Sequence, residues 1–185
     1  CHLNLYYNFI SIEDYFTGNI NYNKINLIIS LDDGYSSWKK FAFPVFKEFK
    51  IKPLLFINCD FVGLSNNESK TYCKKYIGTW AEKAIQWNEI KDFINLGATI
   101  GTHGIKHQNI HRLSSIEIQK LIKKESEIYF KMLGTKPIYH AFTNGLWSDK
   151  ALIELRKLGF SHVFSTESDF LPLKKGSILC YCLTE

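Results

Sequence analysis

The sequence predicts an α/β fold in which parallel strands alternate with helices. Short apolar runs rich in β-branched residues indicate buried strands, and stretches with apolar residues near helical spacing separate them. Three of these stretches end in a Leu-Gly pair, as many helices do. Strands that alternate with helices are joined by right-handed crossovers, so their carboxyl ends meet on one face. The strands are expected over Ile25–Leu31, Pro53–Asn58, Ala98–Gly101, Ile138–Phe142, Phe160–Ser165 and Ile178–Cys182.

Helices are expected between these strands. Within the first, Pro44 starts or kinks the better-formed part, because proline cannot continue a helix through its own position. A capping box formed by Ser114 and Glu117 opens the third helix. The four expected helices cover Ser36–Lys50, Asn88–Leu96, Ser114–Leu133 and Ser148–Leu158.

Two other stretches are less regular. Residues 1–24 form a leading segment, in which Ser11–Phe16 is expected to make a short helical turn. The stretch Cys59–Thr79 is polar and has no clear period, which predicts a long loop that covers a site. We expect a single domain over residues 1–185, because this length suits one hydrophobic core. The chain begins at Cys1 rather than Met, which leaves truncation at either end and a separate export signal or anchor open.

Composition argues against several classes of protein. The 23 Lys and Arg exceed the 18 Asp and Glu only slightly, and no basic block is interleaved with aromatic residues, so we expect no nucleic-acid partner. No apolar run reaches the roughly 20 residues of a transmembrane helix. The five cysteines lack CxxC spacing and are odd in number, which favours neither a zinc knuckle nor a disulfide framework. The composition does not determine the oligomeric state. We expect the protein to act in the cell envelope or the extracellular space rather than in the cytoplasm.

The strand that ends at Leu31 runs directly into two carboxylates, Asp32 and Asp33, followed by Gly34. Glycine permits a sharp turn and a close approach of the backbone to a ligand. Two adjacent carboxylates at the mouth of a buried strand repel each other unless one binds a cation and the other exchanges protons. An acidic turn that only caps the strand is the alternative interpretation.

Two histidines, His103 and His107, follow the third strand at positions i and i+4. On a helical turn this spacing directs both rings the same way, as ligands of a shared metal require, although such pairs also occur as surface or helix-capping residues. A strand-end aspartate supplies a third ligand. Two imidazoles and one carboxylate, with a position left open for water, form a common catalytic zinc set.

These residues resemble the motifs of the polysaccharide deacetylases, the NodB-homology family or carbohydrate esterase family 4. Residues 30–35 (SLDDGY) are similar to its first motif, usually Thr-Phe-Asp-Asp-Gly. Residues 101–107 (GTHGIKH) are similar to its second motif, His-(Ser/Thr)-x-x-His after a glycine, with Gly104 where Ser or Thr is usual. The resemblance extends over about Phe9–Thr166.

The resemblance implies an irregular (β/α) barrel with fewer than eight strands, here over residues 25–185. It also implies that Asp33, His103 and His107 hold Zn²⁺ or another divalent transition metal, and that Asp32 is the general base. The chemistry agrees with these roles. Zinc lowers the pKa of its water toward about 7, and a carboxylate can take the proton as water attacks an acetamide carbonyl.

The third motif of the family supplies a backbone N–H to the oxyanion and is altered in this chain. Residues 140–145 read HAFTNG, where the most similar branch has Phe-Ala-Tyr-Pro-(Tyr/Asn)-Gly. Asn144 is therefore the expected donor, and Thr143 replaces the usual proline. Ala141 stands where many members carry an arginine that orients the base.

The last motif departs further. Residues 178–182 resemble its strand, but no histidine follows to protonate the leaving amine, and Cys182 stands near that position. The acid therefore comes from elsewhere, with His140 as the next candidate, or lies beyond this piece of chain, or the protein is catalytically weak.

The resemblance implies a metal-dependent hydrolase that removes N-acetyl groups from amino sugars of a polysaccharide or oligosaccharide, with an N-acetylated glycan as its partner. A tryptophan near the site could stack on a sugar ring, and Trp80 and Trp147 are the candidates, although Trp147 is equally suited to burial. One alternative is a catalytically weak or inactive carbohydrate-binding domain of the same type. Another keeps the chemistry but acts on an ester or a non-sugar amide. The residues predicted to contact substrate are Tyr35, Thr143, Gly145 and Trp147.

Overall fold

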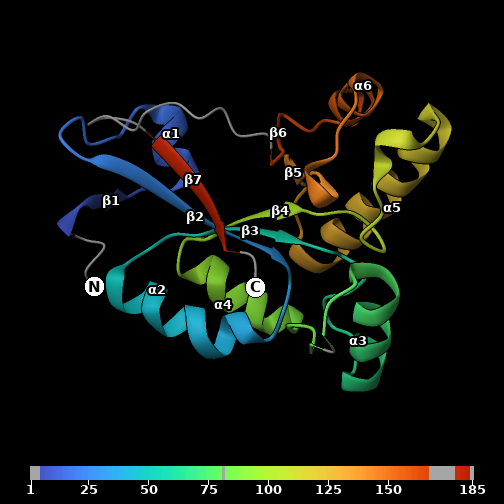
Figure 1. The fold of residues 1–185 in the computed structure, drawn as a ribbon, viewed down its shortest axis with the longest axis horizontal. Coiled ribbons are helices and arrows are strands. Elements are labelled where there is room, and N and C mark those ends of the chain that lie inside the picture. Colours follow the sequence, from blue (N-terminus) through green and yellow to red (C-terminus); the bar gives the residue numbers. More distant parts are fainter. Residues whose placement is uncertain (1–4, 81, 167–177, 184–185) are drawn as a thin grey trace.

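One curled sheet of seven strands forms the centre of the molecule, and helices pack around it (Figure 1). The computed structural model describes residues 5–80, 82–166 and 178–183, the last stretch as backbone. The strand order is β1-β2-β3-β4-β5-β6, and β7 also pairs with β2. Every pairing is parallel. This architecture confirms the predicted irregular (β/α) barrel with fewer than eight strands.

The strands agree closely with the six predicted ones, and β1 is an addition from the leading segment. β1 pairs with the first residues of β2, which attaches the leading segment to the sheet. The strands are β1 (Tyr7–Phe9), β2 (Ile25–Asp33), β3 (Leu54–Ile57), β4 (Thr99–Thr102), β5 (Tyr139–Ala141), β6 (His162–Phe164) and β7 (Ile178–Leu183).

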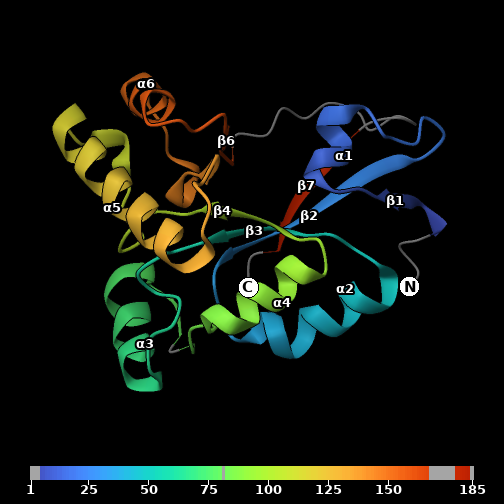
Figure 2. The same cartoon turned by 180° about the vertical axis from the view of Figure 1, so that it is seen from behind.

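The helices lie outside the sheet, as Figures 1 and 2 show from opposite sides. Helix α2 begins after a π-helical turn at Trp38–Ala42, with Pro44 in its first turn as predicted. The predicted capping box at Ser114 is present at the start of α5. The α-helices are α1 (Ile12–Thr17), α2 (Phe43–Phe49), α3 (Asn66–Tyr72), α4 (Trp87–Asn95), α5 (Ser115–Leu133) and α6 (Asp149–Lys157).

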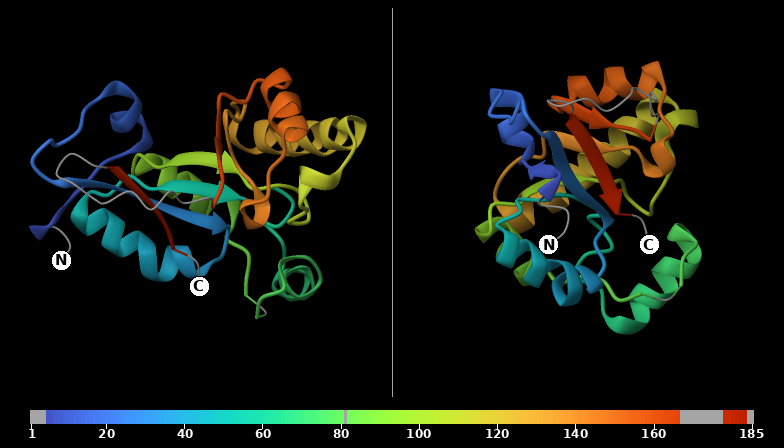
Figure 3. Two further views of the ribbon diagram at one scale, coloured as in Figure 1. Left: turned by 45° about the horizontal axis from the view of Figure 1, so that its top comes forward. Right: turned by 60° about the vertical axis from the view of Figure 1, so that its left-hand side comes forward.

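Strand β2 is buried on both faces, because both are covered. Leu27, Ile29 and Leu31 belong to the larger hydrophobic cluster, which includes Phe46 of α2 and Phe93 of α4. Ile28 points the other way, into a smaller cluster inside the curl of the sheet. Figure 3 shows β7 running beside β2 in both of its views. A strand buried in this way places the carboxylates at its end at a fixed position.

The prediction of a long loop over Cys59–Thr79 is wrong. Part of this stretch forms α3, which continues into a π-helical turn at Cys73–Ile77. Ser65 and Glu68 build a capping box at the start of α3, with the Ser65 hydroxyl accepting from the Glu68 N–H and the Glu68 carboxylate accepting from the Ser65 N–H. The helix is missed because it is short and mostly polar, but the capping pattern itself is readable in the sequence.

Gly101 allows β4 to pack against β3, which yields a testable prediction. A Cβ at this position would lie 2.6 Å from Cδ1 of buried Phe56 and 3.0 Å from Cβ of Tyr139. Gly101→Ala should therefore overpack the sheet and lower the free energy of unfolding by about 1–3 kcal/mol. Urea denaturation of the metal-free parent and variant measures this difference in the free energy of unfolding. An unchanged urea midpoint would show that the sheet accommodates the added methyl group without loss of stability.

Candidate active site

A cleft of about 670 Å³ opens at the carboxyl ends of the strands. The loops after β2, β4 and β5 border it, as the parallel arrangement requires. Residues that follow the π-helical turn at Cys73–Ile77 complete its wall, so the segment predicted to cover a site does border one. The polar residues in the lining include Asp32, Asp33, His103, His107 and Asn144.

A tight turn at Asp33 separates the two neighbouring carboxylates. Asp33 has φ +77°, which is left-handed and costly for a residue with a side chain, and the Gly34 N–H donates to the Asp32 carbonyl at 3.1 Å. Gly34 is also left-handed, and a Cβ there would lie 2.9 Å from a methyl group of Val62. The predicted glycine turn is therefore present, and the strain falls on Asp33.

The contacts of Asp33 fix its carboxylate in one orientation. Its Oδ1 accepts a hydrogen bond from Asn58 Nδ2 at 2.5 Å, and its Oδ2 accepts one from the Tyr35 hydroxyl at 2.9 Å. Asn58 follows β3, next to the end of β2, and was not identified as a site residue from the sequence. Tyr35 is buried and lines the cleft, so it touches Asp33 as well as the space predicted for substrate.

The loop with the two histidines is not a helical turn, which corrects that expectation. Gly104, Lys106 and His107 all have positive φ. The loop is held from outside: the Lys106 N–H donates to Asp60 Oδ1 at 3.1 Å. Its coiled path nevertheless brings the His103 and His107 rings to a centroid separation of 5.3 Å.

The two imidazoles and Asp33 form a donor set that fits a metal ion. Asp33 Oδ1 lies 4.0 Å from His103 Nε2 and 3.7 Å from His107 Nε2. Ligands about 2.1 Å from a tetrahedral zinc ion are about 3.4 Å apart, close to these separations. His103 Nδ1 lies 3.0 Å from the Ala141 carbonyl, so this nitrogen carries the proton and Nε2 keeps its lone pair for a metal. Among the residues that the structure describes, these three form a candidate metal-ligating cluster, with one potential ligand atom from each lying within 4.8 Å of the others.

Asp32 differs from its neighbour Asp33 in the hydrogen bonding of its carboxylate. Its Oδ1 is buried and accepts no hydrogen bond from the described part of the chain. A buried carboxylate oxygen without a donor is unfavourable unless a ligand or water supplies one. Since Asp32 lines the cleft beside the three candidate ligands, it is placed to act on a molecule bound there.

Comparison with known proteins identifies the family of the chain. A sequence model of the family described as polysaccharide deacetylase matches residues 19–163. The chain belongs to the polysaccharide deacetylase family. A search of curated proteins returned no match.

Several solved structures share the fold of this chain. IcaB from Ammonifex degensii has a TM-score of 0.72 at 21% identity, over 97% of this chain and 77% of that one. A de-N-acetylase from Aggregatibacter actinomycetemcomitans has a TM-score of 0.73 at 15% identity, over 97% and 79%. BA3943 of Bacillus anthracis, described as a family pseudoenzyme, has a TM-score of 0.52 at 14% identity, over 74% and 42%. At these identities the likeness extends to the fold alone.

The third family motif follows β5 as a short 3₁₀ turn, Thr143–Gly145. Asn144 has φ +54° and lines the cleft with Gly145, whereas Thr143 is buried behind them. Asn109, missed in the sequence, ties this turn to the histidine loop. Its Oδ1 accepts from the Thr143 hydroxyl and from Asn144 Nδ2, each at 3.0 Å.

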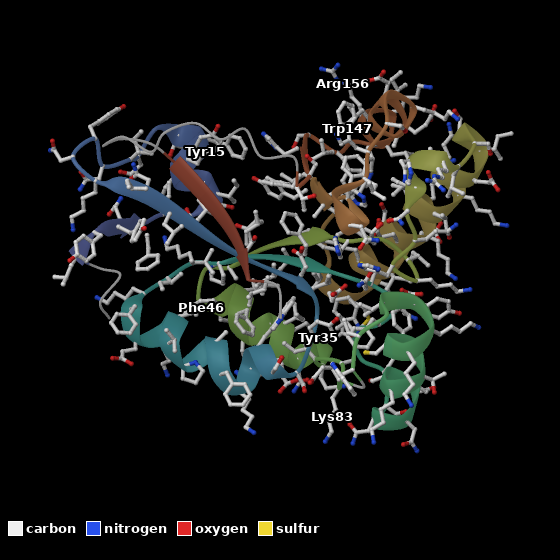
Figure 4. The ribbon with its side chains drawn as sticks, in the orientation of Figure 1. Tyr15, Tyr35, Phe46, Lys83, Trp147 and Arg156 are labelled. Carbon is white, nitrogen blue, oxygen red and sulfur yellow. The ribbon has the colours of Figure 1, made fainter. Side chains whose placement is uncertain are left out.

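The two tryptophans are placed differently. Trp80 is 93% exposed and lines the cleft. Trp147 is 38% exposed, is not among the cleft residues of the described chain, and lies near α6, away from Tyr35 (Figure 4). Of the two candidates for stacking on a sugar, Trp80 has the better position.

Of the two candidates for the acid, His140 does not line the cleft. His140 is buried, and its Nδ1 lies 2.9 Å from the Thr102 hydroxyl. Burial lowers the pKa of His140 to about 3, which keeps the ring neutral. The side chain of Cys182 lies outside the described part of the chain; its backbone pairs with Ser30 of β2.

Buried neutral His140 predicts a pH dependence of stability. Its pKa is about 3 in the folded protein and near 6.5 when unfolded, so the unfolded chain binds the proton first as the pH falls. The free energy of unfolding should therefore decrease below about pH 6.5, with this residue contributing about 2 kcal/mol by pH 5.

Urea denaturation of the metal-free parent and of His140→Gln at pH 7.5 and pH 5 isolates this contribution. The substituted protein should lose less stability between the two pH values, because its residue 140 does not titrate. Equal losses in the two proteins would show that His140 accepts a proton without unfolding.

Proposed function

We propose that this domain is a metal-dependent hydrolase that removes N-acetyl groups from amino sugars of a polysaccharide or oligosaccharide. The single observation that carries the proposal is the pairing of two unlike carboxylates in one cleft. Asp33 faces two imidazole nitrogens, whereas its neighbour Asp32 has a buried oxygen with no hydrogen-bond partner among the described residues. Membership of the polysaccharide deacetylase family supports the same reaction.

The donor set favours zinc, with another divalent transition metal as the alternative. Asp33, His103 and His107 would hold the ion, and a bound zinc ion lowers the pKa of water and polarises a carbonyl oxygen. Asn58 and Tyr35 would keep the Asp33 carboxylate aimed at it.

Asp32 is assigned as the general base. It takes a proton from the attacking water while the water oxygen bonds to the acetamide carbon. The Asn144 backbone N–H is assigned to the oxyanion that develops on the carbonyl oxygen. Breaking the C–N bond then releases acetate and a free amino sugar, and the leaving nitrogen must gain a proton.

We assign this last proton transfer to Asp32 as well. The carboxyl that accepted the proton from water already lies in the cleft, whereas His140 is sealed in the interior and held neutral. Asp32 then acts first as base and later as acid: the proton that it takes from water is the one that it gives to the leaving nitrogen.

The glycan partner is supported by the shape and lining of the cleft. Exposed Trp80 and Phe41 both line it, and aromatic faces stack well on the apolar faces of sugar rings. The altered third and last motifs favour a second candidate, a domain that binds N-acetylated glycan with little turnover. The unpartnered Asp32 argues for turnover, because a binding domain needs no base.

Substituting the two adjacent carboxylates separately tests the proposal. Asp33→Asn and His103→Ala should lose stoichiometric zinc, because each removes one of three ligands. Asp32→Asn should keep zinc and lower the rate of acetate release from N-acetylated glucosamine oligosaccharides by about 10²–10⁴. Elemental analysis measures the bound zinc, and an acetate assay measures turnover.

Two results would contradict the proposal. Loss of zinc in all three variants would show that Asp32 is a metal ligand rather than the base. A parent protein that binds zinc but releases no acetate would favour the binding domain.

Asn109 gives a second prediction, because it holds the turn that carries the oxyanion donor. Asn109→Ala should lower kcat by about 10-fold with zinc retained, less than the 10²–10³ that follows loss of an oxyanion donor. Asn109→Asp keeps the acceptor oxygen and should keep most of the turnover. Arg112→Ala, in the same segment but without a contact to Thr143 or Asn144, is the control. An Asn109→Ala protein as fast as the parent would refute this role.

A further inference from the structure

Glu125 is a fully buried acid in the interior of α5 that the proposed reaction does not use. Burying a carboxyl group inside the protein costs free energy unless hydrogen bonds to other groups compensate for its lost hydration. Burial raises the pKa of Glu125 to about 8, so the group is mostly protonated at neutral pH. The nearby ring of His140, 3.7 Å from Oε2, is neutral as well, so the two do not form an ion pair.

The partner of Glu125 is the loop that carries the two histidines. Its Oε1 accepts a hydrogen bond from the Gly104 N–H at 2.5 Å. Gly104 immediately follows His103, and its φ of +97° begins the left-handed path that returns the chain to His107. The Glu125 carboxyl is therefore bonded to the backbone between the two candidate ligands.

The composition of the loop explains why it needs this support. Its second position carries Gly104 where the family usually has Ser or Thr, so no side chain at that position can brace it. Glycine is also the residue that loses most conformational freedom on folding. A second bond, from the Lys106 N–H to Asp60, holds the far side of the loop.

We propose that Glu125 is a positioning residue of the metal site, which fixes the His103–His107 loop through the Gly104 N–H. The proposal rests on the metal site in the proposed function, and concerns the affinity for the ion rather than the reaction itself. Residues that orient metal ligands typically contribute about 10–100-fold to metal affinity.

Three substitutions test this role through the zinc dissociation constant, measured by chelator competition at pH 7 without substrate. Glu125→Gln retains the length and the acceptor oxygen, and should bind zinc within about 3-fold of the parent. Glu125→Asp keeps a carboxyl but is one methylene shorter, and Glu125→Met removes the acceptor. Both should weaken zinc binding by about 10-fold or more.

Tyr129→Phe is the matched control. Tyr129 lies on the same helix and is buried, and its hydroxyl donates to the Ile100 carbonyl at 2.9 Å, away from the histidine loop. Its loss should destabilise the fold without changing zinc affinity. Circular dichroism of each metal-free variant checks that it folds. If Glu125→Met does not fold, the comparison of zinc affinity between Glu125→Gln and Glu125→Asp still tests the proposal.

Two results would overturn the inference: zinc affinities within 3-fold in every variant, or Glu125→Gln as weak as Glu125→Asp. A parent that binds no zinc would overturn this inference together with the metal-dependent function. A parent that binds zinc but releases no acetate would overturn the proposed hydrolysis alone, because the zinc measurement does not depend on turnover.

Discussion

The left-handed turn at Asp33 is the constraint on which the candidate site depends. Successive side chains of β2 point to opposite faces of the sheet as far as Asp32, as in any strand, and both faces are buried. At Asp33 the φ of +77° breaks this alternation and lets two consecutive carboxylates share one cleft. The hydrogen bonds from Asn58 and Tyr35 supply the interactions that hold the unfavourable backbone in place. Backbone strain of this kind is concentrated at active sites and ligand-binding sites.

The sheet and the metal-side residues could be predicted because their signals are local. Apolar runs ending in polar residues locate the strands, and parallel pairing brings their ends together regardless of loop details. The conformation of the histidine loop could not be predicted, because it depends on hydrogen bonds that its N–H groups donate to Asp60 and Glu125, 46 and 21 residues away along the chain. The i, i+4 spacing selected two histidines whose rings do lie together, but the helical turn on which that expectation rested is absent from this loop.

Glu125 and Asn109 were missed for related reasons. Glu125 follows two lysines in a helix, a context that is typical of a solvated surface, and only the packed structure reveals that it is buried. Asn109 carries an ordinary polar side chain whose two partners lie 34 and 35 residues further along the chain. Helix α3 is the opposite case, because its Ser65–Glu68 capping box was present in the sequence and only the weak apolar pattern concealed it.

Two of the positions where this chain departs from its family on the metal and oxyanion loops share one physical feature. Gly104 replaces a residue with a hydroxyl, and Thr143 replaces a proline that would restrict the backbone, so each change makes a loop at the cleft less constrained. Each loop is then held by a side chain from outside the motifs: Glu125 bonds to Gly104, and Asn109 bonds to Thr143. The two contacts therefore support the proposed function, because they hold both loops of the cleft through side chains that lie outside the family motifs.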